Sequence, residues 1–178
     1  NIAAKNFFSY KSFEYKIVNN QLTMVYGINK DAAKKKSNGS GKSTALDAIS
    51  FALTGDTLKK LKSIKEIINN EENDCDVLID LENKVLKKTL TVMRSLSVKS
   101  SQKIIIFING KEQDQLTDLH PRESDKFIQQ QLGISFDDLL NYYLISKFRY
   151  QSLFLANDSA KKEVINRFSK ADMIDEVF

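Results

Sequence analysis

The sequence predicts an α/β fold, in which short strands and a polar loop lead into a helix and further strands follow. Three observations predict it. Apolar residues fall at helical spacing from Leu46 to Leu53, and Gly55 follows them as a stop signal. Apolar and polar residues alternate between positions 74 and 113, as in strands with one buried face. Asn109-Gly110 is the dipeptide of a tight β-hairpin turn.

Composition excludes several classes of protein. The chain has 178 residues, with 27 Lys plus Arg against 23 Asp plus Glu and a formal net charge of +4, which permits a nucleic-acid partner without requiring one. Cys75 and His120 are the single cysteine and histidine, which excludes an internal disulfide framework and a multi-cysteine or histidine-rich metal centre. The longest apolar run, Ile104–Ile108, is too short to span a membrane, and no signal-peptide pattern opens the chain. We therefore expect a cytoplasmic protein with no membrane partner.

The first part of the chain is expected to contain three strands and a helix. Apolar segments at 2–7, 13–17 and 22–26 predict the strands, which are separated by turns rich in Ser and Asn. A polar stretch then leads to a helix that begins near Lys42 and ends near Gly55. Beyond it we expect a short amphipathic helix at 58–68 and an antiparallel β meander at 74–113.

The last third of the chain is expected to be mainly helical. Pro121 and Gly133 bracket a predicted helix at 122–132, and a short helix is expected at 136–141. An apolar run predicts a buried strand at 142–145. Asp158 is expected to cap a helix at 159–168, and Ser169 is expected to cap another that is still running at the last residue.

The strongest chemical pattern lies between the third predicted strand and the first helix. It consists of Asn38, Gly39, Ser40, Gly41, Lys42, Ser43 and Thr44. Glycines let the backbone fold into a nest whose N–H groups point at phosphate oxygens, and the helix N-terminus adds free amides and a positive dipole end. In such a nest, Lys42 contacts the β- and γ-phosphates and the Ser43 hydroxyl binds Mg²⁺. The alternative interpretation is a solvated loop that happens to precede a helix.

This loop departs from the usual spacing. The phosphate-loop pattern places its first glycine six residues before the lysine, whereas Gly27 stands 15 residues before Lys42. We interpret the difference as an expansion of about nine residues, from roughly Lys30 to Asn38, within the loop. Its lysines either form a solvated tip or fold over the nucleotide or onto DNA.

The loop and its surroundings resemble the N-terminal lobe of SMC-like ABC ATPase heads. The resemblance rests on Asn6-Phe7-Phe8-Ser9-Tyr10, Gly27-Ile28-Asn29 and the run from Asn38 to Ile49. It is nearest to the SbcC-type ATPase subunit of DNA double-strand-break repair exonucleases, including the bacteriophage type. It implies a P-loop NTPase fold of the ABC type, with the P-loop at 27–44 and an antiparallel β arm at about 74–113. Residues 1–168 are then the N-terminal lobe, residues 169–178 begin a helix that leads into a coiled coil, and the C-terminal half of the domain lies outside this chain.

The same resemblance implies ATP and Mg²⁺ as cofactors, with Lys42 and a Q-loop glutamine as catalytic residues. Lys147 stands where that glutamine is expected, so Gln151 is the candidate for holding Mg²⁺ and the attacking water. An ordinary surface glutamine is the alternative. Phe8 stands where the family commonly has an Arg or Lys that approaches the nucleotide. The family's acidic pair, Ser-Gly-Gly signature and His come from a second lobe, so this chain alone is expected to bind ATP and to hydrolyse it poorly.

The implied function is ATP-driven dimerisation of two heads, coupled to DNA binding and to processing by a partner nuclease at the nucleoid. Three alternatives stay open: a chromosome-organising SMC-type ATPase without a nuclease, a nucleotide-insensitive DNA-binding module, and a self-sufficient P-loop kinase. Asp80 ends the one stretch that mimics a catalytic acidic strand, but its alternating neighbours favour a half-exposed strand. The lysines of the meander are expected to form a solvated face, and Cys75 and His120 are expected to have no catalytic role.

Overall fold

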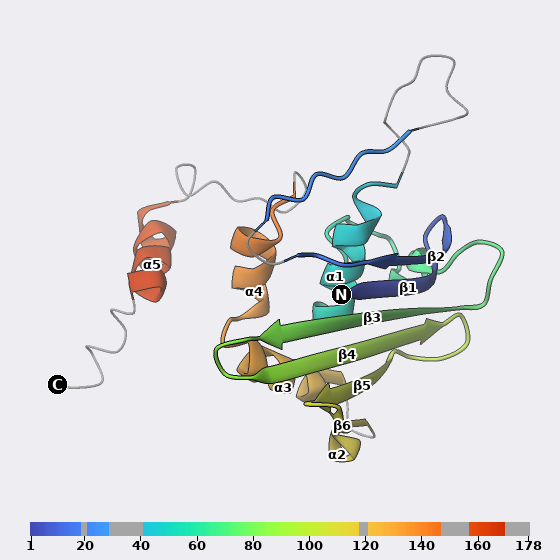
Figure 1. Cartoon of the computed structure of the whole chain (residues 1–178). Coiled ribbons are helices and arrows are strands. Elements are labelled where there is room, and N and C mark those ends of the chain that lie inside the picture. Colours follow the sequence, from blue (N-terminus) through green and yellow to red (C-terminus); the bar gives the residue numbers. More distant parts are fainter. Residues whose placement is uncertain (19–20, 29–40, 118–120, 147–156, 170–178) are drawn as a thin grey trace.

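The described residues form one antiparallel sheet with helices on one face. The computed structural model describes residues 1–18, 21–28, 41–117, 121–146 and 157–169. Within these residues, six strands lie in the order β2-β1-β3-β4-β5-β6 (Figure 1). They are β1 (Ile2–Phe7), β2 (Tyr10–Tyr15), β3 (Asp74–Asn83), β4 (Lys88–Ser97), β5 (Lys103–Ile108) and β6 (Lys111–Glu112). The mixed α/β content agrees with the predicted fold class.

Strands β3 to β6 form the meander that the alternating pattern predicts. β3 and β4 pair along their whole length, from Asp74 opposite Ser97 to Asn83 opposite Lys88. β5 turns into β6 at Asn109-Gly110, where φ is 50° and 76°. Two consecutive positive φ values define the type I′ turn, whose twist matches that of the flanking strands. The sequence therefore predicted this hairpin correctly.

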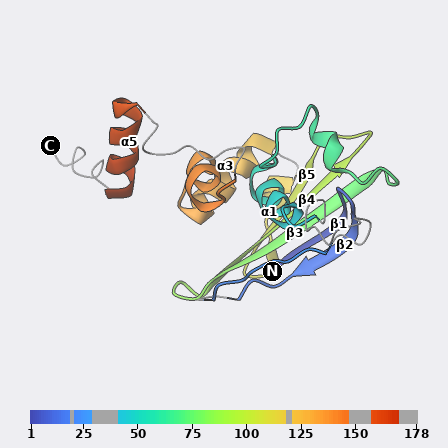
Figure 2. The same cartoon turned by 90° about the horizontal axis from the view of Figure 1, so that it is seen from above.

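Helices α1 and α3 cover one face of the sheet, as the two views show (Figures 1 and 2). The helical elements are α1 (Thr44–Thr54), η1 (Ile64–Ile67), α2 (Asp114–Thr117), α3 (Pro121–Leu132), α4 (Phe136–Asp138), η2 (Leu139–Tyr143) and α5 (Asp158–Ser169). Gly55 and Gly133 end α1 and α3 with φ of 74° and 69°, which is the left-handed conformation that glycine adopts most easily. None of the described helices is long and apolar enough to cross a bilayer.

The core lies between the sheet and these two helices. Alternate residues of β3 (Cys75, Val77 and Ile79) are buried on the helix-facing side, as are Phe51 of α1 and Ile128 of α3. Period-two burial in a strand places one row of side chains in the core and the other outside it. Asp80 falls in the other row and accepts a hydrogen bond from the Thr91 hydroxyl at 2.6 Å, in agreement with the half-exposed strand that its neighbours predicted.

Two of the strands predicted near the N-terminus differ in the structure. The second strand is Tyr10–Tyr15 instead of 13–17, because the chain reverses within two residues after Phe7. The predicted strand at 22–26 is not formed. A strand needs a neighbour for its N–H and C=O groups, and this segment pairs with neither edge strand of the described sheet, β2 or β6. Leu22 and Tyr26 are instead 93% and 80% exposed.

The predicted amphipathic helix at 58–68 is wrong except for η1 at its end. The Asp47 carboxylate accepts hydrogen bonds from the backbone N–H groups of Leu58 and Lys59, at 3.1 and 3.3 Å. These bonds hold the segment against α1 and replace the helical pattern at that point. Ser63 caps the short η1 at its start and forms a capping box with Glu66.

The predicted strand at 142–145 is also wrong. Ser135 caps α4 by accepting a hydrogen bond from the Asp138 N–H at 3.1 Å, and the chain then continues as η2, a π-helical turn. The Leu144 N–H donates to the Leu139 carbonyl at 2.8 Å and closes that turn. The helix predicted at 159–168 is present as α5, of which Ser169 is the last residue. The helix that Ser169 is expected to cap lies outside the described residues. The remainder of the predicted coiled-coil start, 170–178, lies outside the described residues.

Candidate functional site

The end of the predicted phosphate loop forms a tight turn into α1. Gly41 has a φ of 76°, and its carbonyl oxygen accepts a hydrogen bond from the Thr44 N–H at 2.9 Å. The Ser43 carbonyl oxygen accepts the first helical bond, from the Asp47 N–H at 3.0 Å. Helix α1 therefore begins immediately after Lys42 and Ser43, as the sequence predicted. Asn38, Gly39 and Ser40 lie outside the described residues.

Ser43 occupies the N-cap position of α1 without acting as a cap. Its backbone is helical, with φ −73° and ψ −14°, and its hydroxyl makes no capping hydrogen bond. The side chain is exposed. The first N–H groups of a helix lack intrahelical partners and attract anions. The Ser43 hydroxyl, which makes no capping hydrogen bond beside them, would be available to bind Mg²⁺, so the residues present suit Mg²⁺ and a nucleotide.

An aromatic cavity of about 100 Å³ lies beside this turn. Three of its lining residues belong to β2, where the rings of Tyr10 and Phe13 pack edge to face with their centroids 5.3 Å apart. The Tyr10 ring packs so closely on Gly41 that a Cβ atom there would lie 2.6 Å from it. The full lining is Tyr10, Phe13, Tyr15, Val25, Tyr26, Gly41, Lys42 and Ala45. An apolar pocket with a cation at its edge suits a flat ring attached to phosphates.

This cavity was not predicted from the sequence. Its signal was three aromatic residues within the six of β2, Tyr10, Phe13 and Tyr15. Alone, such a cluster is more often part of a core. Its proximity to Lys42 depends on the fold, because β2 and the start of α1 are far apart in the sequence.

Asp47 of α1 and Lys59, in the segment that follows α1, form an ion pair that was not predicted from the sequence. The Lys59 ammonium lies 3.3 Å from Oδ2 of Asp47, a carboxylate that is 1% exposed. Burial raises the pKa of Asp47, and the Lys59 charge opposes that rise. The same ammonium stands 4.7 Å above the ring of Phe8, within cation–π range. A cation therefore lies on the ring of Phe8, the residue that stands where the resembling family commonly has an Arg or Lys.

The other predicted site residues stand apart from this site or outside the described residues. Gln151, Lys147 and His120 lie outside them, so the Q-loop assignment stays a prediction. Cys75 is fully buried in β3, and burial raises the pKa of its thiol to about 12. A protonated thiol in the core is a poor nucleophile.

The turn of glycine, lysine and serine that leads into α1 corresponds to the helix end of the loop that P-loop nucleotide-binding domains use. Over residues 1–176 the chain matches the model of the family described as an AAA domain. It therefore belongs to the AAA domain family of P-loop ATPases, for which nucleotide binding is the general function. No curated protein matches the chain significantly.

Proposed function

We propose that the chain is the ATP-binding N-terminal lobe of an SMC-like ATPase head. The observation that carries the proposal is the start of α1, where Gly41 and Lys42 line the aromatic cavity and are followed by the uncapped Ser43. The family match over 1–176 supports a P-loop ATPase. The sequence resemblance supports the narrower SMC-like class.

In this proposal each part of the site binds one part of Mg·ATP. The loop amides and the N-terminus of α1 bind the phosphates, and Lys42 adds a point charge. The Ser43 hydroxyl binds Mg²⁺, which neutralises charge on the phosphate oxygens when it is bound. The aromatic cavity receives the base, since a flat ring gains stacking and apolar burial there.

The proposal also includes a partner lobe. Segment 21–28 leads directly into the loop, and it exposes Leu22, Met24, Tyr26 and Ile28 at 93%, 64%, 80% and 77%. Such a row of exposed apolar residues favours contact with another part of a protein. We assign this contact to the C-terminal lobe of the same protein, which would supply strands beside residues 22–26. No general base is evident among the described residues of the site, so hydrolysis by this chain alone is expected to be very slow.

The biological role that we propose is DNA repair or recombination. Two complete heads close over two nucleotides, and this closure controls DNA access for a partner nuclease. The alternative within the same chemistry is a chromosome-organising ATPase without a nuclease. A zinc-hook Cys-x-x-Cys at the apex of the coiled coil would favour repair, whereas a hinge domain would favour the alternative.

Nucleotide titration with and without Mg²⁺ tests the site. The variant Ser43→Ala should bind ATP like wild type without Mg²⁺ and should lose the gain in affinity that Mg²⁺ brings. Equal affinity of the two proteins in Mg²⁺ would contradict the role of Ser43. DNA binding that depends on salt and ignores ATP would instead support the nucleotide-insensitive DNA-binding module.

A further inference from the structure

Arg94 occupies a core position of β4. The neighbouring inward residues of that strand are Val92 and Leu96, and the Arg94 side chain is, like theirs, fully buried. Burial lowers the pKa of Arg94, and the hydrogen bond and charge of Asp125 oppose this. An arginine stays protonated in proteins, so the core contains a cation. Because apolar side chains often replace buried ion pairs without loss of stability, stability alone is a weak reason for a charge at this position.

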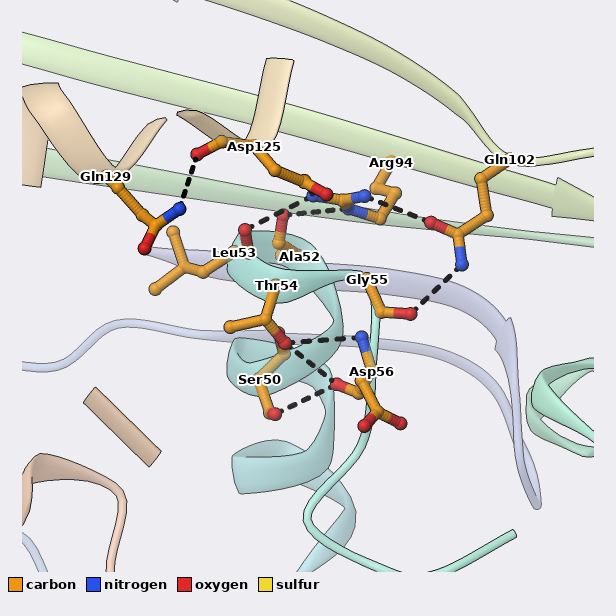
Figure 3. Close-up of polar contacts among 10 residues, drawn as sticks. All are labelled: Ser50, Ala52, Leu53, Thr54, Gly55, Asp56, Arg94, Gln102, Asp125 and Gln129. Carbon is orange, nitrogen blue, oxygen red and sulfur yellow. Dashed lines mark hydrogen bonds and ion pairs between the residues drawn. The ribbon is translucent and has the colours of Figure 1, made fainter. Parts of the chain in front are cut away.

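The guanidinium of Arg94 binds the C-terminal end of α1 (Figure 3). Its Nε donates to the Ala52 carbonyl oxygen and its Nη2 to that of Leu53, both at 3.2 Å. Nη1 donates to Gln102 Oε1 at 3.0 Å, and the Gln102 amide donates to the Gly55 carbonyl oxygen at 3.0 Å. These carbonyls lie at the end of α1, where helix geometry leaves the last groups without partners and the dipole is negative. The guanidinium of Arg94 therefore holds the end of α1 directly, through two carbonyl oxygens, and indirectly through Gln102.

The same guanidinium also binds α3. Its Nη2 donates to Asp125 Oδ1 at 2.8 Å. One turn further on, the Gln129 side chain donates to the Asp125 carbonyl oxygen at 3.5 Å and accepts a hydrogen bond from the Phe136 N–H at 3.0 Å. Figure 3 shows Asp125 and Gln129 on the helix beside the end of α1. A continuous set of polar contacts thus runs from α1 through Arg94 to α3 and to the first residue of α4.

We propose that Arg94 is a positioning residue that ties the C-terminal end of α1 to α3, and so couples nucleotide binding at the other end of α1 to the position of α3 and α4. This inference rests on the proposed nucleotide site. The physical reason is that α1 is a rigid rod with an anion site at one end and Arg94 at the other. A ligand that shifts α1 strains or relieves the directional bonds of Arg94, and Asp125 carries that change to α3.

The test compares Asp125→Asn with Glu123→Gln, two neutralising changes on the same helix. Asp125 binds Arg94, whereas Glu123 pairs on the surface with Lys126 at 2.9 Å and is the control. Affinity for Mg·ATP and amide hydrogen exchange in α3, with and without Mg·ATP, are measured on the 178-residue chain. Wild type and Glu123→Gln should show added protection of α3 amides when Mg·ATP binds. Asp125→Asn should lose that added protection and should bind Mg·ATP about tenfold more weakly.

A folded Arg94→Lys variant should show the same loss of α3 protection and of Mg·ATP affinity. Lysine keeps the charge but lacks the planar set of N–H donors that reaches α1, Gln102 and Asp125 together. If Arg94→Lys does not fold, Asp125→Asn alone decides the question. Wild-type affinity together with wild-type protection of α3 in Asp125→Asn would overturn the inference and leave the nucleotide site intact. A wild-type chain that binds no Mg·ATP would overturn the proposed function as well.

Discussion

Replacement of Gly55 by alanine tests how closely Arg94 packs on the end of α1. Gly55 has a φ of 74°, and a Cβ atom there would lie 2.7 Å from Arg94 Nη1 and 2.8 Å from Gln102 Oε1. Gly133 is the matched control: it ends α3 with a φ of 69°, its N–H bonds the carbonyl four residues back, and a Cβ there would meet nothing within 4 Å. Both variants carry the same backbone strain, and only Gly55→Ala also displaces a charged hydrogen bond.

The expected magnitudes follow from these two contributions. A left-handed alanine costs about 1 kcal/mol relative to glycine, so Gly133→Ala should lower the free energy of unfolding by about that amount. Gly55→Ala should lose about 2 kcal/mol more, the value of one hydrogen bond to a charged group. For a chain of this length the difference corresponds to about 6 °C in Tm.

Urea unfolding followed by circular dichroism measures both variants against wild type. Gly55→Ala should unfold at a lower urea midpoint than Gly133→Ala, and the two slopes should be similar. Equal losses in the two variants would refute it, because they would show that Arg94 and Gln102 do not constrain this glycine.

Two further predictions concern the buried ionisable groups. Burial raises the pKa of Asp47 above its ordinary value of 3.8. The folded chain therefore holds this proton more tightly than the unfolded chain, and the associated stability is present at low pH and lost as pH rises through the raised pKa. In urea unfolding at several pH values, wild type should lose stability relative to Asp47→Asn as pH rises above 3.8; a relative gain would contradict this. Cys75, with a pKa of about 12 and no exposure, should react with a thiol reagent only after unfolding, and rapid labelling of the native chain would disprove its burial.

The parts of the fold that were predictable depend on local chemistry. The helix stop at Gly55 and the hairpin at Asn109-Gly110 both need left-handed backbone, and the sequence marks such positions with Gly and Asn. The meander was predictable because its alternation matches a sheet with one buried face. In each case neighbouring residues carry the whole signal.

The errors arose where distant residues decide the structure. An apolar segment such as 22–26 becomes a strand only beside a partner strand, and it pairs with neither edge strand of the described sheet. The backbone at 58–59 donates hydrogen bonds to the Asp47 carboxylate and does not form the helix that its apolar spacing predicts. Arg94 was a missed signal, because the alternation that buries Val92 and Leu96 also points Arg94 inward.

Only the loop residues of the candidate site could be predicted from the sequence. The pattern from Gly41 to Thr44 is contiguous and has a physical meaning at fixed spacing. The aromatic cavity and the Asp47–Lys59 pair depend on contacts between β2, α1 and the segment after α1. No spacing rule within one segment reports such contacts.

Equilibrium titration of Mg·ATP into wild type, Lys42→Ala and the control Lys84→Ala tests the central claim most directly. Lys42 borders the aromatic cavity at the start of α1, whereas Lys84 is exposed in the turn between β3 and β4. A hydrogen bond to a charged group contributes about 1.5 to 3 kcal/mol, so Lys42→Ala should bind at least tenfold more weakly. Lys84→Ala should bind like wild type. Equal affinity of wild type and Lys42→Ala would contradict the assignment of the nucleotide site to the start of α1.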